Sequence, residues 1–261
     1  MSQNSDIGWC HHTVNTVWGC TEVSEACDFC YAREMDKRRG PMFDDGNLHW
    51  GKDAPRWVRA DEAITELHRL DRRAGRMGER HRVFINSMSD TFEDHPQLPP
   101  ARTALFQAAV EVQHLDILLL TKRPHNVLGM VPPAWLEAWP THVWMGTTVE
   151  CPPWDVVRLS VLAKIPAAVR FVSYEGAIAP VQFRKWLGPD KVNWLICGCE
   201  SGAKRRPMAE EWARQAASDA IDAGIPFFMK QMVRNGQVTA DMADFPPDLQ
   251  LQQFPTSEVM A

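Results

Sequence analysis

Short apolar runs alternate with longer amphipathic stretches along most of the chain. Each run is a few residues long and ends in polar residues, as expected for strands that are buried on both faces. The runs cover residues 83–90, 115–123, 143–150, 169–176, 192–201 and 226–231. Patterns typical of helices fill the intervals, and Pro and Gly residues separate them. These stretches cover residues 60–77, 97–113, 153–164, 179–187 and 209–223.

Strands and helices that alternate in this way favour a parallel sheet. A further strand near residues 13–18 brings the expected number of parallel strands to about six or seven. We therefore predict an α/β fold, a single partial β/α barrel over residues 1–236, with a Pro-rich C-terminal extension over residues 237–261 packed on it. An open, doubly wound sheet is the alternative that the pattern leaves open.

Polar residues follow every predicted strand. In a β/α barrel, the carboxyl ends of the strands form the mouth where an active site lies. Six polar strand ends in succession therefore predict a functional mouth. Its residues would be Asn86, Ser87, Ser89, Asp90, Thr121, Lys122, Arg123, Thr147, Thr148, Glu150, Ser173, Glu175, Glu200, Ser201, Lys230 and Gln231.

Composition supports a globular protein that works inside the cell. The chain has 261 residues, of which 45% are hydrophobic and 23% charged. No apolar run is long enough to span a membrane, and the N-terminus does not have the pattern of a signal peptide. The net charge is −5, but basic residues gather at 37–39, 68–82 and 204–206. These stretches fit either solvated surfaces or contacts to nucleic-acid phosphates.

The cysteines carry the clearest chemical signal. Four of the seven lie within the first thirty residues, and Cys20, Cys27 and Cys30 have the spacing C-x6-C-x2-C. Three thiolates from one loop can hold three corners of a 4Fe–4S cluster and leave the fourth iron open to a substrate. The loop follows the first predicted strand, so it is expected at the mouth. A structural zinc site that adds His11 or His12 is the alternative.

The pair Phe29-Cys30 and the position of its loop resemble the radical S-adenosylmethionine superfamily. The usual motif of that superfamily is C-x3-C-x-aromatic-C after the first strand of a partial barrel, whereas the first gap here is six residues. A closer resemblance, over nearly the whole chain, is to a family of phage and prophage proteins known for a three-cysteine motif. The matching stretches are IGWCHHTVNTVWGCTEVSEACDFCYA, SMSDTFEDHP, LLTKRP, WMGTTVE, FVSYEGA, WLICGCESGAKRRPM and PFFMKQ.

This resemblance implies a 4Fe–4S cluster on Cys20, Cys27 and Cys30, with S-adenosylmethionine as the second cofactor. The loop after the second strand would bind the methionine amino group through Asp90, assisted by Ser87 and Ser89. Lys122 and Arg123 would pair with the methionine carboxylate. The remaining cofactor contacts are expected from Thr147, Glu150, Ser173 and Glu175, the last two at the ribose. On local grounds, Asp90 fits equally well as a helix N-cap before Thr91, and Lys122 and Arg123 fit a solvent-facing strand end.

Cys199, Glu200 and Lys230 are the residues expected to face the substrate. Cys199 fits either a hydrogen-atom donor or an extra ligand, or else a buried thiol without chemistry. Cys151, which adjoins Glu150 at another strand end, has the same alternatives, whereas Cys10 and Cys197 receive no role.

The resulting hypothesis is a cytoplasmic radical enzyme that generates a 5′-deoxyadenosyl radical to modify a nucleobase, a nucleotide or DNA. A phage-encoded protein would work in the host cytoplasm. Its partners would be S-adenosylmethionine, an external electron donor, and DNA or a nucleotide that Lys204, Arg205 and Arg206 contact at the mouth. The alternatives are a zinc- or iron–sulfur-containing nucleic-acid-binding protein without turnover, and a radical enzyme that acts on a small metabolite.

Overall fold

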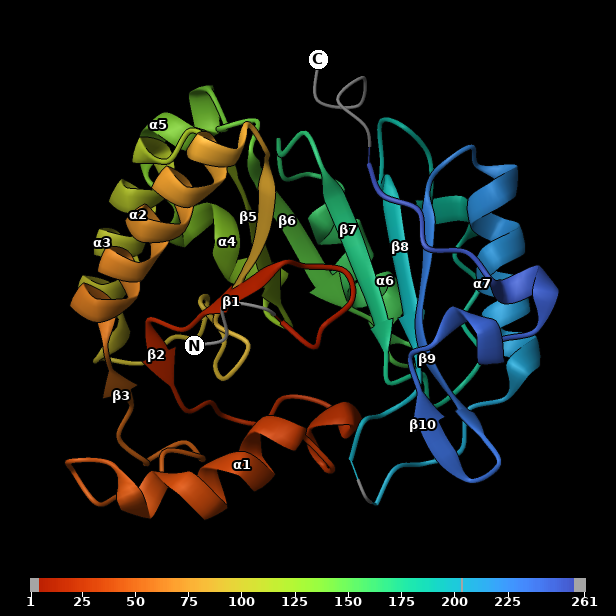
Figure 1. Cartoon of the computed structure of the whole chain (residues 1–261), viewed down its shortest axis with the longest axis horizontal. Coiled ribbons are helices and arrows are strands. Elements are labelled where there is room, and N and C mark those ends of the chain that lie inside the picture. Colours follow the sequence, from red (N-terminus) through yellow and green to blue (C-terminus); the bar gives the residue numbers. More distant parts are fainter. Residues whose placement is uncertain (1–4, 203, 256–261) are drawn as a thin grey trace. The chain divides into compact units, whose positions relative to one another are not determined.

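The computed structural model describes residues 5–202 and 204–255 (Figure 1). The chain divides into two compact units, Met1–Val143 and Trp144–Ala261. No helix within the described ranges is both long and apolar enough to cross a membrane.

The first unit is built around a parallel sheet in the order β1-β4-β5, and β2 and β3 form a separate antiparallel pair. Its strands are β1 (His12–Val14), β2 (Val17–Trp18), β3 (Trp57–Val58), β4 (His81–Ile85) and β5 (Leu115–Thr121). Its helices are α1 (Tyr31–Arg39), α2 (Ala60–Met77), α3 (Leu98–Glu111), α4 (Pro124–Met130) and α5 (Pro133–Glu137), with short 3-10 turns η1 (Glu25–Cys27) and η2 (Gly40–Met42). Helix α2 contacts α3, β1 and β5 through an apolar stripe.

In the second unit, β6 to β9 run parallel and β10 returns antiparallel along β9. The strands are β6 (Val143–Thr148, beginning at the unit boundary), β7 (Arg170–Glu175), β8 (Trp194–Gly198), β9 (Phe227–Arg234) and β10 (Gln237–Thr239). The helical segments are α6 (Trp154–Leu162), α7 (Glu210–Asp222), η3 (Arg184–Trp186), η4 (Met242–Asp244) and η5 (Pro247–Leu249). Helix α7 packs on β8 and β9 (Figure 1).

The alternation of parallel strands with helices in both units confirms the predicted α/β fold of the partial β/α-barrel type. The parallel strands β1, β4 and β5 in the first unit and β6 to β9 in the second match the expected number. The predicted domain boundary at residue 236 falls in the turn between β9 and β10. Beyond β10, Leu251 accepts a hydrogen bond from the amide of Met229, and Gln253 donates one to Phe227, so this segment lies along β9.

The prediction of a helix over residues 179–187 is wrong, because only the 3-10 turn η3 forms there. The amides of Phe183 and Arg184 donate to the buried Asp219 carboxylate at 2.8 and 3.1 Å rather than to helical carbonyls. The sequence pattern also misses α1, which is polar on most of its surface and buries only Ala32 and Asp36. A helix without an apolar stripe leaves no periodic signal.

Candidate functional site

The loop that carries Cys20, Cys27 and Cys30 (residues 20–30, the cysteine loop) starts near the carboxyl end of β4. The amide of Gly19 donates to the carbonyl of Met88 at 3.0 Å, and Gly19 forms an isolated parallel bridge with Ser89. Gly19 has a φ of +110°, and a Cβ added there would lie 2.3 Å from the carbonyl oxygen of His49. Only glycine fits this conformation and this close approach, so the position before Cys20 is defined by backbone packing.

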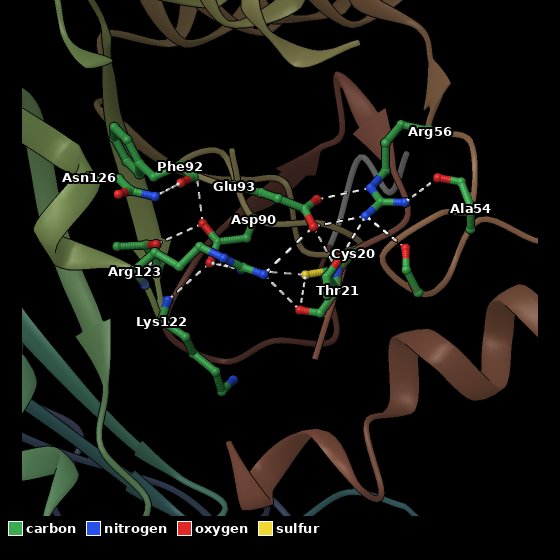
Figure 2. Close-up of polar contacts among 12 residues, drawn as sticks. Cys20, Thr21, Ala54, Arg56, Asp90, Phe92, Glu93, Lys122, Arg123 and Asn126 are labelled. Carbon is green, nitrogen blue, oxygen red and sulfur yellow. Dashed lines mark hydrogen bonds and ion pairs between the residues drawn. The ribbon is translucent and has the colours of Figure 1, made fainter. Parts of the chain in front are cut away.

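Cys20 lies beside the guanidinium of Arg123, which follows β5 (Figure 2). Arg123 Nη1 is 3.8 Å from Cys20 Sγ and 2.9 Å from Asp90 Oδ2. Burial and then the charge of Asp90 raise the pKa of the Cys20 thiol to about 12, against the opposing effect of Arg123. Burial alone would lower the pKa of Arg123, but the negative charges of Asp90, Cys20 and Glu93 outweigh it and raise that pKa.

Thr21, the residue after Cys20, is held by all three of its polar groups. Its amide donates to Glu93 Oε1 at 2.9 Å, and its hydroxyl accepts from Arg56 Nη2 at 2.8 Å. Its carbonyl accepts from Arg123 Nη2 at 2.7 Å. Figure 2 shows these charged side chains converging on Cys20 and Thr21. The backbone at the first cysteine is therefore anchored from three sides.

Arg56 and Glu93 bind each other and hold Thr21 in place. Neither residue is predicted from the sequence. Glu93 is buried, and hydrogen bonds from Arg56 and Thr21 lower its pKa although burial acts in the opposite direction. Arg56 also donates to the carbonyls of His49 and Ala54. Glu93 lies in the stretch SMSDTFEDHP, but no local pattern marks its partner, which is 37 residues away.

Asp90 is buried, and both of its carboxylate oxygens are engaged. It accepts hydrogen bonds from Phe92 N (3.0 Å), Thr121 Oγ1 (2.7 Å), Lys122 N (3.1 Å) and Arg123 Nη1 (2.9 Å). The N-cap interpretation is wrong, because the next helix begins at Leu98 rather than at Thr91. Asp90 instead ties the loop after β4 to the end of β5. The solvent-facing interpretation of Arg123 is also wrong, because its side chain is buried.

The loop after β4 contacts the chain on both sides of the cysteine loop. Ser89 Oγ donates to the carbonyl of Val17 at 3.0 Å, before the first cysteine. The hydroxyl of Tyr31, directly after Cys30, donates to the carbonyl of Ser87 at 2.9 Å. Ser87 Oγ also lies 3.3 Å from the side chain of Asn15. Ser87 and Ser89 are thus near the two ends of the loop.

The chemistry of the three cysteine side chains fits an iron–sulfur cluster that is bound by thiolates. Cys20, Cys27 and Cys30 come from one short segment; Cys27 ends η1, and Cys30 directly precedes α1. Thiolates from one loop are the ligands that iron–sulfur clusters use. In the conformation described for residues 5–202 and 204–255, no three His, Cys, Asp or Glu side chains are gathered closely enough to hold a metal ion. Binding would therefore require the segment between Cys20 and Cys30 to bring its thiols together.

The histidines of the zinc alternative are engaged at the other end of β1. His12 Nε2 lies 3.0 Å from His81 Nδ1, and His11 Nδ1 accepts the amide of Arg82 at 2.8 Å. These contacts are at the amino ends of β1 and β4, whereas Cys20 lies beyond their carboxyl ends. The geometry therefore gives no support to either histidine as a fourth ligand.

In the second unit, Ser173 and Glu175 in the last part of β7 come together with Lys230, which lies in the middle of β9. Glu175 Oε1 lies 2.7 Å from Lys230 Nζ, and Glu175 Oε2 accepts from Ser173 Oγ at 2.8 Å. Glu150 is fully buried and pairs with Arg158 at 2.7 Å, and Thr147 is buried as well. The polar strand ends thus divide into an ionic group, Ser173, Glu175 and Lys230, and a buried ion pair, Glu150 and Arg158.

Glu200 binds Arg206 rather than lying open. Its Oε2 accepts the amide of Arg206 at 2.7 Å, and the Arg206 guanidinium forms an ion pair with the same carboxylate. Cys199 is buried, which raises the pKa of its thiol although Lys230 and Arg205 oppose the shift. Of the basic triplet, Lys204 is exposed and Arg205 donates to the carbonyl of Gly236.

The basic stretch at residues 68–82 lies mainly at the amino ends of the strands. Arg80 pairs with Asp116 near the start of β5, and Arg69 pairs with Glu66 on α2. Arg72 and Arg76 are exposed on the same helix. Within the first unit, residues 68–82 are therefore remote from the carboxyl ends of the strands, where the cysteine loop lies.

These features define an α/β protein with a three-cysteine loop at the carboxyl ends of its first strands. The chain belongs to the family described as "Protein of unknown function (DUF5131)", whose model matches residues 4–247. Comparison with curated proteins finds no match. Among solved structures, the chain is similar to a spore photoproduct lyase variant with bound AdoMet and dinucleoside spore photoproduct. That likeness has 12% identity and a TM-score of 0.46, over 88% of this chain and 67% of the other.

Proposed function

We propose that this protein is a radical S-adenosylmethionine enzyme whose 4Fe–4S cluster is held by Cys20, Cys27 and Cys30. The observation that carries the proposal is the position of the three-cysteine loop, with Cys20 beside Arg123 at the carboxyl end of β5. Active sites of β/α folds lie at this edge of the sheet. Three cysteine ligands leave one iron of a cubane cluster without a protein ligand, which suits a chelating cofactor.

The chain's own residues hold the start of the cysteine loop in position. Gly19 allows the close approach of the backbone, and the contacts of Thr21 with Glu93, Arg56 and Arg123 fix the first thiol. When bound, the cluster and S-adenosylmethionine would supply a 5′-deoxyadenosyl radical that removes a hydrogen atom from the substrate. Preorganised protein groups then need only orient the cofactor and exclude water.

We assign the methionine end of the cofactor to the loop after β4. Ser87 and Ser89 lie near both ends of the cysteine loop, and Lys122 follows β5. Asp90 supports this loop, since its carboxylate already accepts hydrogen bonds from four groups.

In the second unit, Thr147, Glu150, Ser173 and Glu175 are the proposed cofactor residues. Cys199, Glu200 and Lys230 are the proposed substrate residues. Among them, the Ser173–Glu175–Lys230 group offers the polar contacts that suit hydroxyls.

We further propose a nucleobase, nucleotide or DNA as the substrate. The support is the basic triplet that follows β8, of which Lys204 is exposed. Cationic side chains beside a site favour phosphates. A small metabolite is the competing substrate class, and a titration of the protein with DNA at low salt separates the two.

Anaerobic reconstitution with iron and sulfide, followed by an assay for 5′-deoxyadenosine, tests the proposal. We expect about four irons per chain and 5′-deoxyadenosine formation under reducing conditions. The variants Cys20→Ala, Cys27→Ala and Cys30→Ala should each lose the visible absorbance, whereas Cys10→Ala and Cys151→Ala should keep it. Stoichiometric zinc without iron–sulfur absorbance in anaerobically prepared protein would refute the proposal.

A further inference from the structure

We infer that Arg123 sets the reduction potential of the iron–sulfur group bound at Cys20, and that Asp90 is the positioning residue that keeps the guanidinium there. This inference rests on the proposed function. It assigns to both residues a task other than binding the methionine end of the cofactor.

Two hydrogen bonds attach Arg123 to the first cysteine and its neighbour. Nη1 lies 3.8 Å from Cys20 Sγ, within range of an N–H···S contact, and Nη2 donates to the carbonyl of Thr21 at 2.7 Å. One contact reaches the side chain and the other the backbone that carries it. Because the guanidinium is planar and rigid, these two contacts together fix its position relative to the Cys20 thiol.

The guanidinium is also held from the other side. Asp90 Oδ2 accepts from Nη1 at 2.9 Å, and Asp90 is itself fixed by Thr121 and by the amide of Lys122. The Arg123 side chain is only 9% exposed. A buried charge in a fixed position is screened little by solvent and salt, so it acts on its neighbours more strongly than a surface charge.

Both terminal nitrogens of Arg123 already donate to protein atoms, which argues against its predicted use for the methionine carboxylate. Nη1 already contacts Asp90 and Cys20, and Nη2 already contacts Thr21 and Glu93, whereas a bidentate carboxylate needs two N–H groups of the guanidinium. Figure 2 shows Arg123 directed toward Cys20 and Asp90. Lys122, the residue directly before Arg123, keeps its proposed role at the methionine end of the cofactor.

The charges around Cys20 are balanced only while Arg123 is present. Arg56, Glu93, Arg123 and Asp90 alternate in sign, and Glu93 lies 3.6 Å from Arg123. Without Arg123, two carboxylates would face one guanidinium beside a thiolate. An iron–sulfur group gains negative charge on reduction, so a nearby cation and an N–H···S bond stabilise the reduced form and raise the potential.

The test is a redox titration of the reconstituted protein, followed by electron paramagnetic resonance. Arg123→Gln should shift the potential to more negative values, and Arg123→Lys, which keeps the charge, should shift it less. Arg80→Gln is the matched control, because it removes another Arg–Asp pair of the same unit, at the amino end of β5. We expect the control to have the reduction potential of the wild type. The wild type and the three variants should have equal iron content.

An Arg123→Gln protein with the wild-type potential would overturn the inference. If an Arg123 variant folds, as judged by circular dichroism, but binds no iron, Arg123 acts in assembly and the inference is also wrong. Failure of the proposed function gives a different result, since the wild type itself would then bind no iron.

Discussion

Glu93 and Arg56 form a buried ion pair joined by two hydrogen bonds. Arg56 Nε donates to Glu93 Oε2 at 2.9 Å, and Nη2 donates to Oε1 at 2.8 Å. The two side chains are 4% and 0% exposed, respectively. Both also bind Thr21, so the pair links the core of the first unit to the residue that follows Cys20.

Glu93→Gln should destabilise the protein by about 3–5 kcal/mol, because it leaves the buried charge of Arg56 without its partner. Urea unfolding of the apoprotein measures the change. Glu66→Gln is the control, since Glu66 pairs with the partly exposed Arg69 on α2, and such a pair contributes less than about 1 kcal/mol. Equal losses in the two variants would contradict a special role for the buried pair.

Gly19→Ala should both destabilise the first unit and reduce iron binding. The added Cβ would lie 2.3 Å from the carbonyl of His49, at a φ of +110°. The control is Gly46→Ala, where φ is +65° but nothing lies within 4 Å of the added Cβ. Backbone strain alone should lower the free energy of unfolding of the control by about 1 kcal/mol. Gly19→Ala should lower it clearly more. Thermal unfolding and iron analysis provide the two measurements, and full iron content in Gly19→Ala would count against the anchored loop.

His11 should make stability depend on pH in the mildly acidic range. Burial, followed by the charges of Arg82, His81 and His12, lowers its pKa from 6.5 to about 4, although Glu79 opposes the shift. Between these two values the unfolded state binds a proton that the folded state does not, so stability falls as the pH drops from 6.5 toward 4.

His11→Asn removes this titration while keeping an acceptor for the amide of Arg82. Its unfolding midpoint should depend less on pH between 6.5 and 4 than that of the wild type. Urea midpoints at several pH values measure the effect. Parallel curves for the two proteins would show that His11 does not contribute.

Lys204 and Arg205 should contribute to DNA binding if the substrate is nucleic acid. We expect the double charge reversal Lys204→Glu and Arg205→Glu to weaken binding at low salt and to reduce the salt dependence of the affinity. Arg206 is left unchanged because it pairs with Glu200. Reversal of the exposed Arg72 and Arg76 on α2 is the control, with little expected effect. Absence of measurable affinity of the wild type for DNA or RNA would favour a small metabolite.

Local sequence patterns predicted the regular elements well where burial is periodic. The helix expected at residues 60–77 has the observed bounds of α2, and the strand expected from residue 115 begins there as β5. The failure at residues 179–187 has a tertiary cause, because the Asp219 carboxylate from α7 takes the amides that a helix would have used. Periodicity cannot report such a competing partner.

The sequence alone determined the alternation of strands and helices, the spacing of the three cysteines, and the polar character of the strand ends. These properties follow from backbone geometry and from residue order. Only the tertiary structure decided which charges meet: Arg123 reaches Cys20 across 103 residues of chain, and Arg56 reaches Glu93 across 37. Such pairs form because folding buries charged groups from distant segments, and a buried charge requires a partner of opposite sign.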